Sequence, residues 1–110
     1  MSEVMRTLEA NEAEYQQEAY RFCLSIRDEA KTFDPEDIAD DEGNPSIDVR
    51  IQVSEDGGCS FHSGDASYDT DHRGFWGASS VSPADGEWEC IQTGRDLVEQ
   101  ALEHASQVLC

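Results

Sequence analysis

The chain has 110 residues, the length of one domain, and 37% of them are hydrophobic, which suffices for a small core without metal or disulfide staples. Its 25 acidic and seven basic side chains leave a formal net charge of −18. Direct binding to nucleic acid is disfavoured, because phosphates would meet a field of their own sign. With no membrane-spanning apolar run and no signal-peptide pattern, the sequence predicts a cytoplasmic protein with reduced cysteines.

The first predicted element is one long helix over residues 3–33. Apolar side chains recur at spacings of three, four and seven and form one stripe: Leu8, Tyr15, Ala19, Phe22, Ile26, Ala30 and Phe33. Asp34-Pro35 ends this pattern, because the residue before a proline is driven out of the α region.

Residues 34–46 follow as an acidic loop. Six of them are carboxylates: Asp34, Glu36, Asp37, Asp40, Asp41 and Glu42. Ile38 is the one large apolar side chain of this segment, and we expect it to attach the loop to the core. The loop is either a solvated connector or a contact surface, and the sequence leaves both interpretations open.

An antiparallel meander is predicted over residues 47–92. Residues 47–54 alternate apolar and polar side chains, as a half-buried strand does, and the Asp-Gly-Gly sequence ending at Gly58 is typical of a hairpin turn. Residues 59–63 and 75–81 are the next two strands, and residues 87–92, with Trp88 and Cys90, are predicted as a short fourth strand.

The last predicted element is a helix over residues 94–109, with Thr93 and Asp96 as a variant of the capping box. The whole pattern predicts a single α+β domain over residues 1–110. In it, a small antiparallel meander of three or four strands is covered on one face by an N-terminal and a C-terminal helix.

The densest group of functional side chains lies between His62 and Trp76. Four of them have the chemistry of metal ligands: His62, Asp69, Asp71 and His72. Their spacing matches no established metal motif. Ser60 and His62 share a strand face without a third catalytic member, and Cys59 points to the opposite face. We therefore predict no catalytic residue, metal or cofactor, with a metal-dependent or thiol enzyme centred on residues 62–72 as the alternative.

The segment YDTDHRGFWGASSV, residues 68–81, resembles sequences of short proteins from phages and mobile elements. It covers a small part of the chain and transfers no catalytic residue. Small acidic proteins of this kind include anti-CRISPR and anti-restriction inhibitors, several of which occupy the positively charged nucleic-acid channel of their target. The resemblance thus implies an inhibitor of a host defence complex, acting in the host cytoplasm.

Charge, size and resemblance together predict a non-enzymatic binding protein whose carboxylates imitate nucleic-acid phosphates on a basic surface of a nucleic-acid-binding host protein. Besides the six acids of the loop, the predicted contact residues are Asp65, Tyr68, Asp69, Asp71 and Trp76. A housekeeping or adaptor domain from a salt-adapted organism explains the same acidity. The sequence is compatible with a homodimer as well as a monomer.

Overall fold

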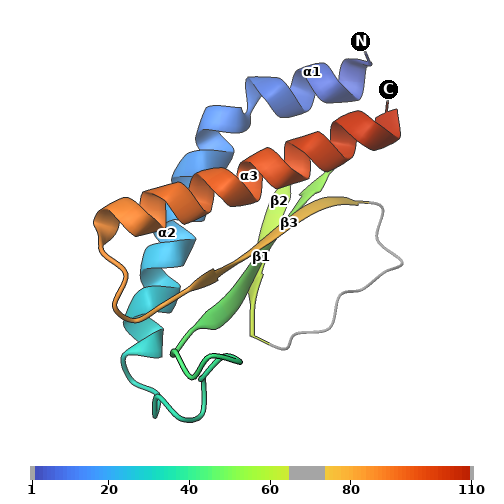
Figure 1. The fold of residues 1–110 in the computed structure, drawn as a ribbon. Helices are drawn as coiled ribbons and strands as arrows, with labels where there is room; N and C mark the ends of the chain where they lie inside the picture. Colours follow the sequence, from blue (N-terminus) through green and yellow to red (C-terminus); the bar gives the residue numbers. More distant parts are fainter. Residues whose placement is uncertain (1, 65–73, 110) are drawn as a thin grey trace.

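The structure is a computed structural model that describes residues 2–64 and 74–109. Within these ranges the chain forms three helices and one three-stranded antiparallel sheet (Figure 1). In chain order the elements are α1 (Glu3–Ala10), α2 (Glu12–Ala30), β1 (Ile47–Ser54), β2 (Cys59–Ser63), β3 (Gly74–Val81) and α3 (Glu87–Leu109). The predicted α+β class, with helices at both ends of the chain, is confirmed.

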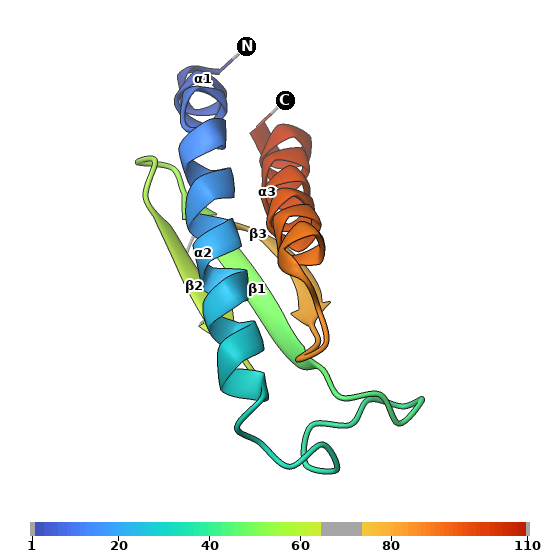
Figure 2. The same cartoon turned by 90° about the vertical axis from the view of Figure 1, so that its left-hand side faces the viewer.

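The core lies between one face of the sheet and the helices. Alternation along β1 buries Ile47, Val49, Ile51 and Val53, as the sequence predicts. Figure 2 shows α2 and α3 side by side across this face. Phe22 of α2 stacks on Phe61 of β2, with ring centroids 5.1 Å apart. Each fully buried large side chain stabilises the fold by about 1.5–3 kcal/mol. The side chains buried between the sheet and the helices therefore hold the small sheet against α2 and α3.

The strand order differs from the predicted meander. β1 is central, and the sheet has the order β2-β1-β3, with both neighbours antiparallel to β1. Ser63, the last residue of β2, is opposite Val49, whereas Gly74, the first of β3, is opposite Ser54. β2 and β3 therefore both pair with β1 and do not pair with each other as a hairpin. The physical reason for the order is that the most apolar strand is best covered when it lies in the middle, under both helices.

The single helix predicted over residues 3–33 is divided at Asn11. This residue has φ −98° and ψ 3°, outside helical geometry, and the chain bends there between α1 and α2 (Figure 1). Asparagine is a weak helix former, because its side chain competes for backbone hydrogen bonds. The break brings the start of α2 onto the β1–β2 turn, where the Tyr15 hydroxyl donates to the carbonyl oxygen of Gly57 at 2.7 Å.

The C-terminal end of this helical region also differs from the prediction. α2 ends at Ala30, and a tight turn follows in which the amide of Thr32 donates to the Glu29 carbonyl at 2.9 Å. The turn rotates Phe33 away from the predicted stripe, and the side chain is 43% exposed.

The predicted fourth strand does not form, because residues 87–92 are the first turns of α3. The helix begins at Glu87, and the amide of the preceding Gly86 donates to the Glu89 carboxylate at 2.9 Å. The predicted Thr93 and Asp96 pair therefore does not start the helix. Cys90 is buried on the same helix face as Leu97 and Ala101. Alternation over so short a segment did not distinguish a strand from a helix.

Two glycines allow α3 to pack closely against its neighbours. A Cβ atom at Gly94 would lie 2.9 Å from the Tyr20 backbone nitrogen of α2, and one at Gly77 would lie 2.3 Å from the Leu97 carbonyl oxygen. The α3 side chains then reach the outer edge of β3. Gln100 accepts from the Ala78 amide at 3.2 Å and donates to its carbonyl at 2.9 Å, which covers part of an otherwise open strand edge.

Candidate functional site

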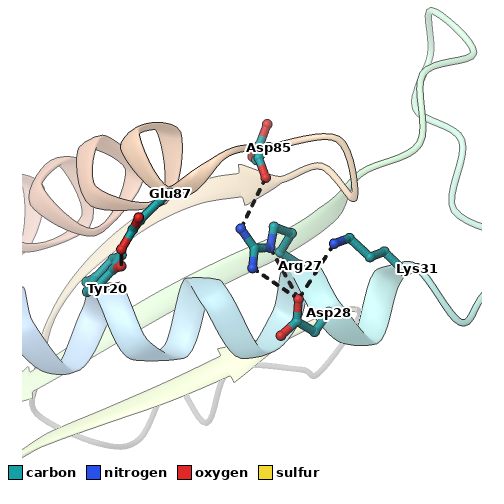
Figure 3. A network of polar contacts seen from close by, with 6 residues as sticks. All are labelled: Tyr20, Arg27, Asp28, Lys31, Asp85 and Glu87. Carbon is teal, nitrogen blue, oxygen red and sulfur yellow. Dashed lines mark hydrogen bonds and ion pairs between the residues drawn. The ribbon is translucent and has the colours of Figure 1, made fainter.

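The acidic loop, residues 34–46, joins α2 to β1 and carries six carboxylates, all on exposed residues. In the described part of the chain, none of the six forms an ion pair with a lysine or arginine. The two nearest bases along the chain are engaged elsewhere, since Arg27 and Lys31 pair with Asp28 at 3.2 and 3.9 Å (Figure 3). Within residues 2–64 and 74–109, no ion pair therefore neutralises the negative charge of the loop.

The loop has a defined backbone fold. A carboxylate oxygen of Asp40 accepts from the amides of Glu42 and Asn44, both at 2.9 Å, and the turn passes through Gly43 at φ 85°. Glycine fits this left-handed conformation without strain. Ile38 packs against the core, as predicted, and its carbonyl accepts from the Ser46 amide at 2.9 Å. The loop is thus a structured hairpin, closed by a bridge between residues 39 and 45, and not an irregular connector.

The six acids divide into two groups by their hydrogen bonds. Asp34 and Asp40 hold the loop, because each accepts from backbone amides within it. The other four carboxylates accept no hydrogen bond from the described residues: Glu36, Asp37, Asp41 and Glu42. No described residue engages these four side chains, which distinguishes them from the two that shape the loop.

A surface groove of about 680 Å³, which we call the loop–sheet groove, lies beside the loop. Its apolar lining includes Phe33, Ile38 and Ile47. Five carboxylates also line it: Glu29, Asp37, Asp40, Asp41 and Asp48. It adjoins the C-terminal end of α2, where the helix dipole favours a cation. Such a groove suits the apolar stem and charged head of a lysine or arginine side chain.

The charge of the whole molecule is spread along an elongated body. Its longest Cα extent is 46 Å, so a net charge of −18 amounts to about one charge per 2.6 Å. Nucleic acid carries one phosphate per about 1.7 Å of duplex axis and one per about 3.4 Å of a single strand. The linear charge density of the protein lies between these two values.

Of the other predicted contact residues, the structure describes only Trp76. Trp76 lies on β3 and is 49% exposed. Its ring contacts the His104 ring edge-on, with centroids 5.7 Å apart, so the side chain is half-buried. The predictions at Asp65, Tyr68, Asp69 and Asp71, and His72 of the metal alternative, lie outside the described residues. Among the residues described, no three potential metal ligands cluster.

The thiols that the structure describes, those of Cys23, Cys59 and Cys90, are free. Burial raises the pKa of Cys23 and of Cys59 from 9.0 to about 12 and also raises the pKa of Cys90. A second cause acts on the pKa of Cys59, because its sulfur donates to the Glu18 carboxylate at 2.9 Å. At neutral pH these three thiols are protonated, whereas the nucleophile of a thiol enzyme is a thiolate.

The sequence did not indicate that two aromatic side chains, Phe33 and Trp88, are exposed at the surface. Phe33 was predicted to lie in the core, and Trp88 was placed on a strand, yet they are 43% and 64% exposed. Both errors follow from misplaced helix ends. The apolar spacing of α2 continues to Phe33 although the helix ends at Ala30. For α3, the start was predicted after Thr93 although the helix already begins at Glu87.

Comparison of the chain with known protein families, characterised proteins and solved structures finds no match. No family therefore supplies a function for this chain. Over residues 2–64 and 74–109, no helix combines the length and the apolar character needed to cross a membrane.

Proposed function

We propose that this protein is a non-enzymatic binding protein that occupies a basic nucleic-acid-binding surface of a host defence complex. In this proposal it is a phage-encoded inhibitor of the anti-CRISPR or anti-restriction type, and it acts in the host cytoplasm. The observation that carries the proposal is the acidic loop, a structured hairpin beside a groove lined by acids and apolar side chains. Four of its carboxylates accept no hydrogen bond from any residue that the structure describes.

The charge density supports phosphate imitation in particular. Phosphates are spaced at about 1.7 Å along the axis of a duplex and about 3.4 Å along a single strand, and the net charge of this protein divided by its longest extent, about one charge per 2.6 Å, lies within that range. The raised thiol pKa values disfavour the thiol-enzyme alternative at Cys23, Cys59 and Cys90. Attraction between this acidic protein and a basic partner would accelerate their association and make the association rate sensitive to salt.

A matched pair of charge variants tests the proposal. The loop variant changes Glu36→Gln, Asp37→Asn, Asp41→Asn and Glu42→Gln, and leaves the turn-forming Asp34 and Asp40 in place. The control variant makes four changes at exposed positions outside the loop: Glu9→Gln, Glu55→Gln, Glu99→Gln and Glu103→Gln. Both variants lose the same charge, so a difference between them reports position.

The assay is displacement of labelled DNA from a panel of CRISPR effector and restriction complexes. We expect displacement by the unaltered protein, weakening steeply with added salt. If each of the four exposed contacts contributes about 0.5 kcal/mol, the loop variant loses about 2 kcal/mol of binding free energy, which is about a thirtyfold loss of affinity. The affinity of the control variant should fall by less than about threefold. Failure to displace DNA from any complex, or equal losses in both variants, would refute phosphate imitation by the loop.

A further inference from the structure

The most exposed large apolar side chain in the described ranges is Trp88, at 64%, in the first turn of α3. It borders a second surface groove of about 430 Å³, which we call the tryptophan groove. The opposite wall is the end of the acidic loop, from Asn44 to Ser46. An exposed indole beside a groove is unusual on a surface otherwise dominated by charge, and tryptophan is among the residues that anchor interfaces.

Hydrogen bonds fix both walls of the tryptophan groove. Asp40 holds the loop wall through its two backbone contacts. On the α3 side, the Tyr20 hydroxyl donates to the Glu87 carboxylate at 2.7 Å, and Arg27 donates to the Asp85 carbonyl at 3.5 Å (Figure 3). These contacts fasten the start of α3 to α2. A groove whose walls are held before binding loses less conformational entropy when it is filled.

The electrostatics of the groove favour a cation. Asp40, Asp85 and Glu89 line it, and Glu87 lies in the same helix turn as Trp88. The N-terminal end of α3 contributes about half a positive charge, which the carboxylates outweigh. Arg27, which donates to the Asp85 carbonyl in this wall, is paired with Asp28.

We propose that the tryptophan groove binds an arginine side chain of the partner, with the guanidinium stacked on Trp88 and its N–H groups donating to the surrounding carboxylates. This inference rests on the proposed function for the basic character of the partner and adds the identity of the contact. Arginine fits better than lysine, because its planar guanidinium stacks on aromatic rings and donates two parallel hydrogen bonds to a carboxylate. A second copy of this chain is a poorer occupant, since each copy carries a net charge of −18.

The test compares hexa-arginine and hexa-lysine peptides as probes, using isothermal titration calorimetry on the full chain. Trp88→Leu removes the stacking surface and keeps an apolar side chain. Val108→Ala alters an apolar side chain that is 61% exposed near the other end of α3, and serves as the control. Two-dimensional NMR follows the Trp88 indole N–H, identified by its absence from the spectrum of the Trp88→Leu variant.

We expect hexa-arginine to bind the unaltered protein about three- to thirtyfold more tightly than hexa-lysine, the range of a cation–π contact. Hexa-arginine should shift the Trp88 indole signal. Trp88→Leu should abolish the preference and leave hexa-lysine binding within about twofold, and Val108→Ala should change neither affinity.

Three results would overturn the inference, and they separate it from the proposed function. If Trp88→Leu leaves the arginine preference intact while the loop variant weakens both peptides, the groove is not the arginine site and the acidic loop remains a binding surface. If both peptides bind without dependence on salt and the loop variant has no effect, the proposed function fails as well. If the free protein sediments as a dimer that Trp88→Leu dissociates, the occupant is a second copy.

Discussion

Gly94 provides a test in which helix propensity and packing predict opposite signs. Alanine in place of glycine inside a helix stabilises it by about 1 kcal/mol, so the sequence taken alone favours Gly94→Ala. In the structure a Cβ atom here would lie 2.9 Å from the Tyr20 nitrogen and 3.2 Å from the Ala19 carbonyl carbon. Both are backbone atoms, which cannot rotate away, so α3 must move off α2.

Overpacking of this kind costs about 1–3 kcal/mol, and contact with backbone lies toward the upper end. After the propensity gain is subtracted, we expect Gly94→Ala to lower the free energy of unfolding by about 1–2 kcal/mol, and Tm by about 4–8 °C. Urea and thermal denaturation followed by circular dichroism measure both quantities.

The pair Glu99→Gly and Glu99→Ala supplies the control on the exposed face of the same helix. There alanine should be more stable than glycine by about 1 kcal/mol, because only propensity differs. The difference between positions 94 and 99 isolates the packing cost. If Gly94→Ala stabilises the protein as the Glu99 pair predicts, the close crossing of α2 and α3 is wrong.

Three further predictions concern the thiols, the net charge and the loop. The folded-state pKa of Cys23 and of Cys59 is raised from 9.0 to about 12, so their contribution to stability is complete below about pH 9 and is lost as the pH rises toward 12. Urea titrations across this range should show the decline, and iodoacetamide at pH 8 should label both thiols much faster in urea than in the folded protein. The acidic side chains repel one another in a protein with a net charge of −18, and salt screens this repulsion. Tm should therefore rise by on the order of 5 °C between 20 and 500 mM NaCl. A fall in Tm would show that attractive ion pairs dominate. Asp40→Ala should accelerate hydrogen exchange at the amides of Glu42 and Asn44 about fivefold, equivalent to about 1 kcal/mol, whereas Asp40→Asn, which keeps an oxygen acceptor, should not.

The sequence correctly predicted the elements whose conformation depends on residues close to one another in the chain. The alternation of Ile47 to Val53 and the glycines of the next turn define β1 and the hairpin to β2, and Gly57 has the positive φ of 93° that such a turn requires. The Ile38 contact also followed from one apolar side chain in a polar segment. In each case neighbouring residues suffice to determine the conformation.

The errors arose where distant contacts decide the conformation. Thr93-Gly94 has the appearance of a helix start, yet Gly94 is inside α3 because α2 crosses at that point. The central position of β1 depends on where the helices lie, and a chain read in order suggests sequential pairing instead. Trp88 borders a groove because α3 begins as early as Glu87 and the end of the acidic loop lines the same groove, and neither fact can be deduced from the residues around Trp88.

The acidic loop shows why counting carboxylates does not by itself identify a binding surface. Six acids look equivalent in the sequence, but Asp34 and Asp40 accept backbone hydrogen bonds that shape the loop. Neutralising all six together would remove charge and also loosen the hairpin that forms a wall of both grooves. A loss of binding would then have two explanations. Changing Glu36, Asp37, Asp41 and Glu42 alone leaves the turn contacts in place, so any loss of affinity reports the charge presented to the partner.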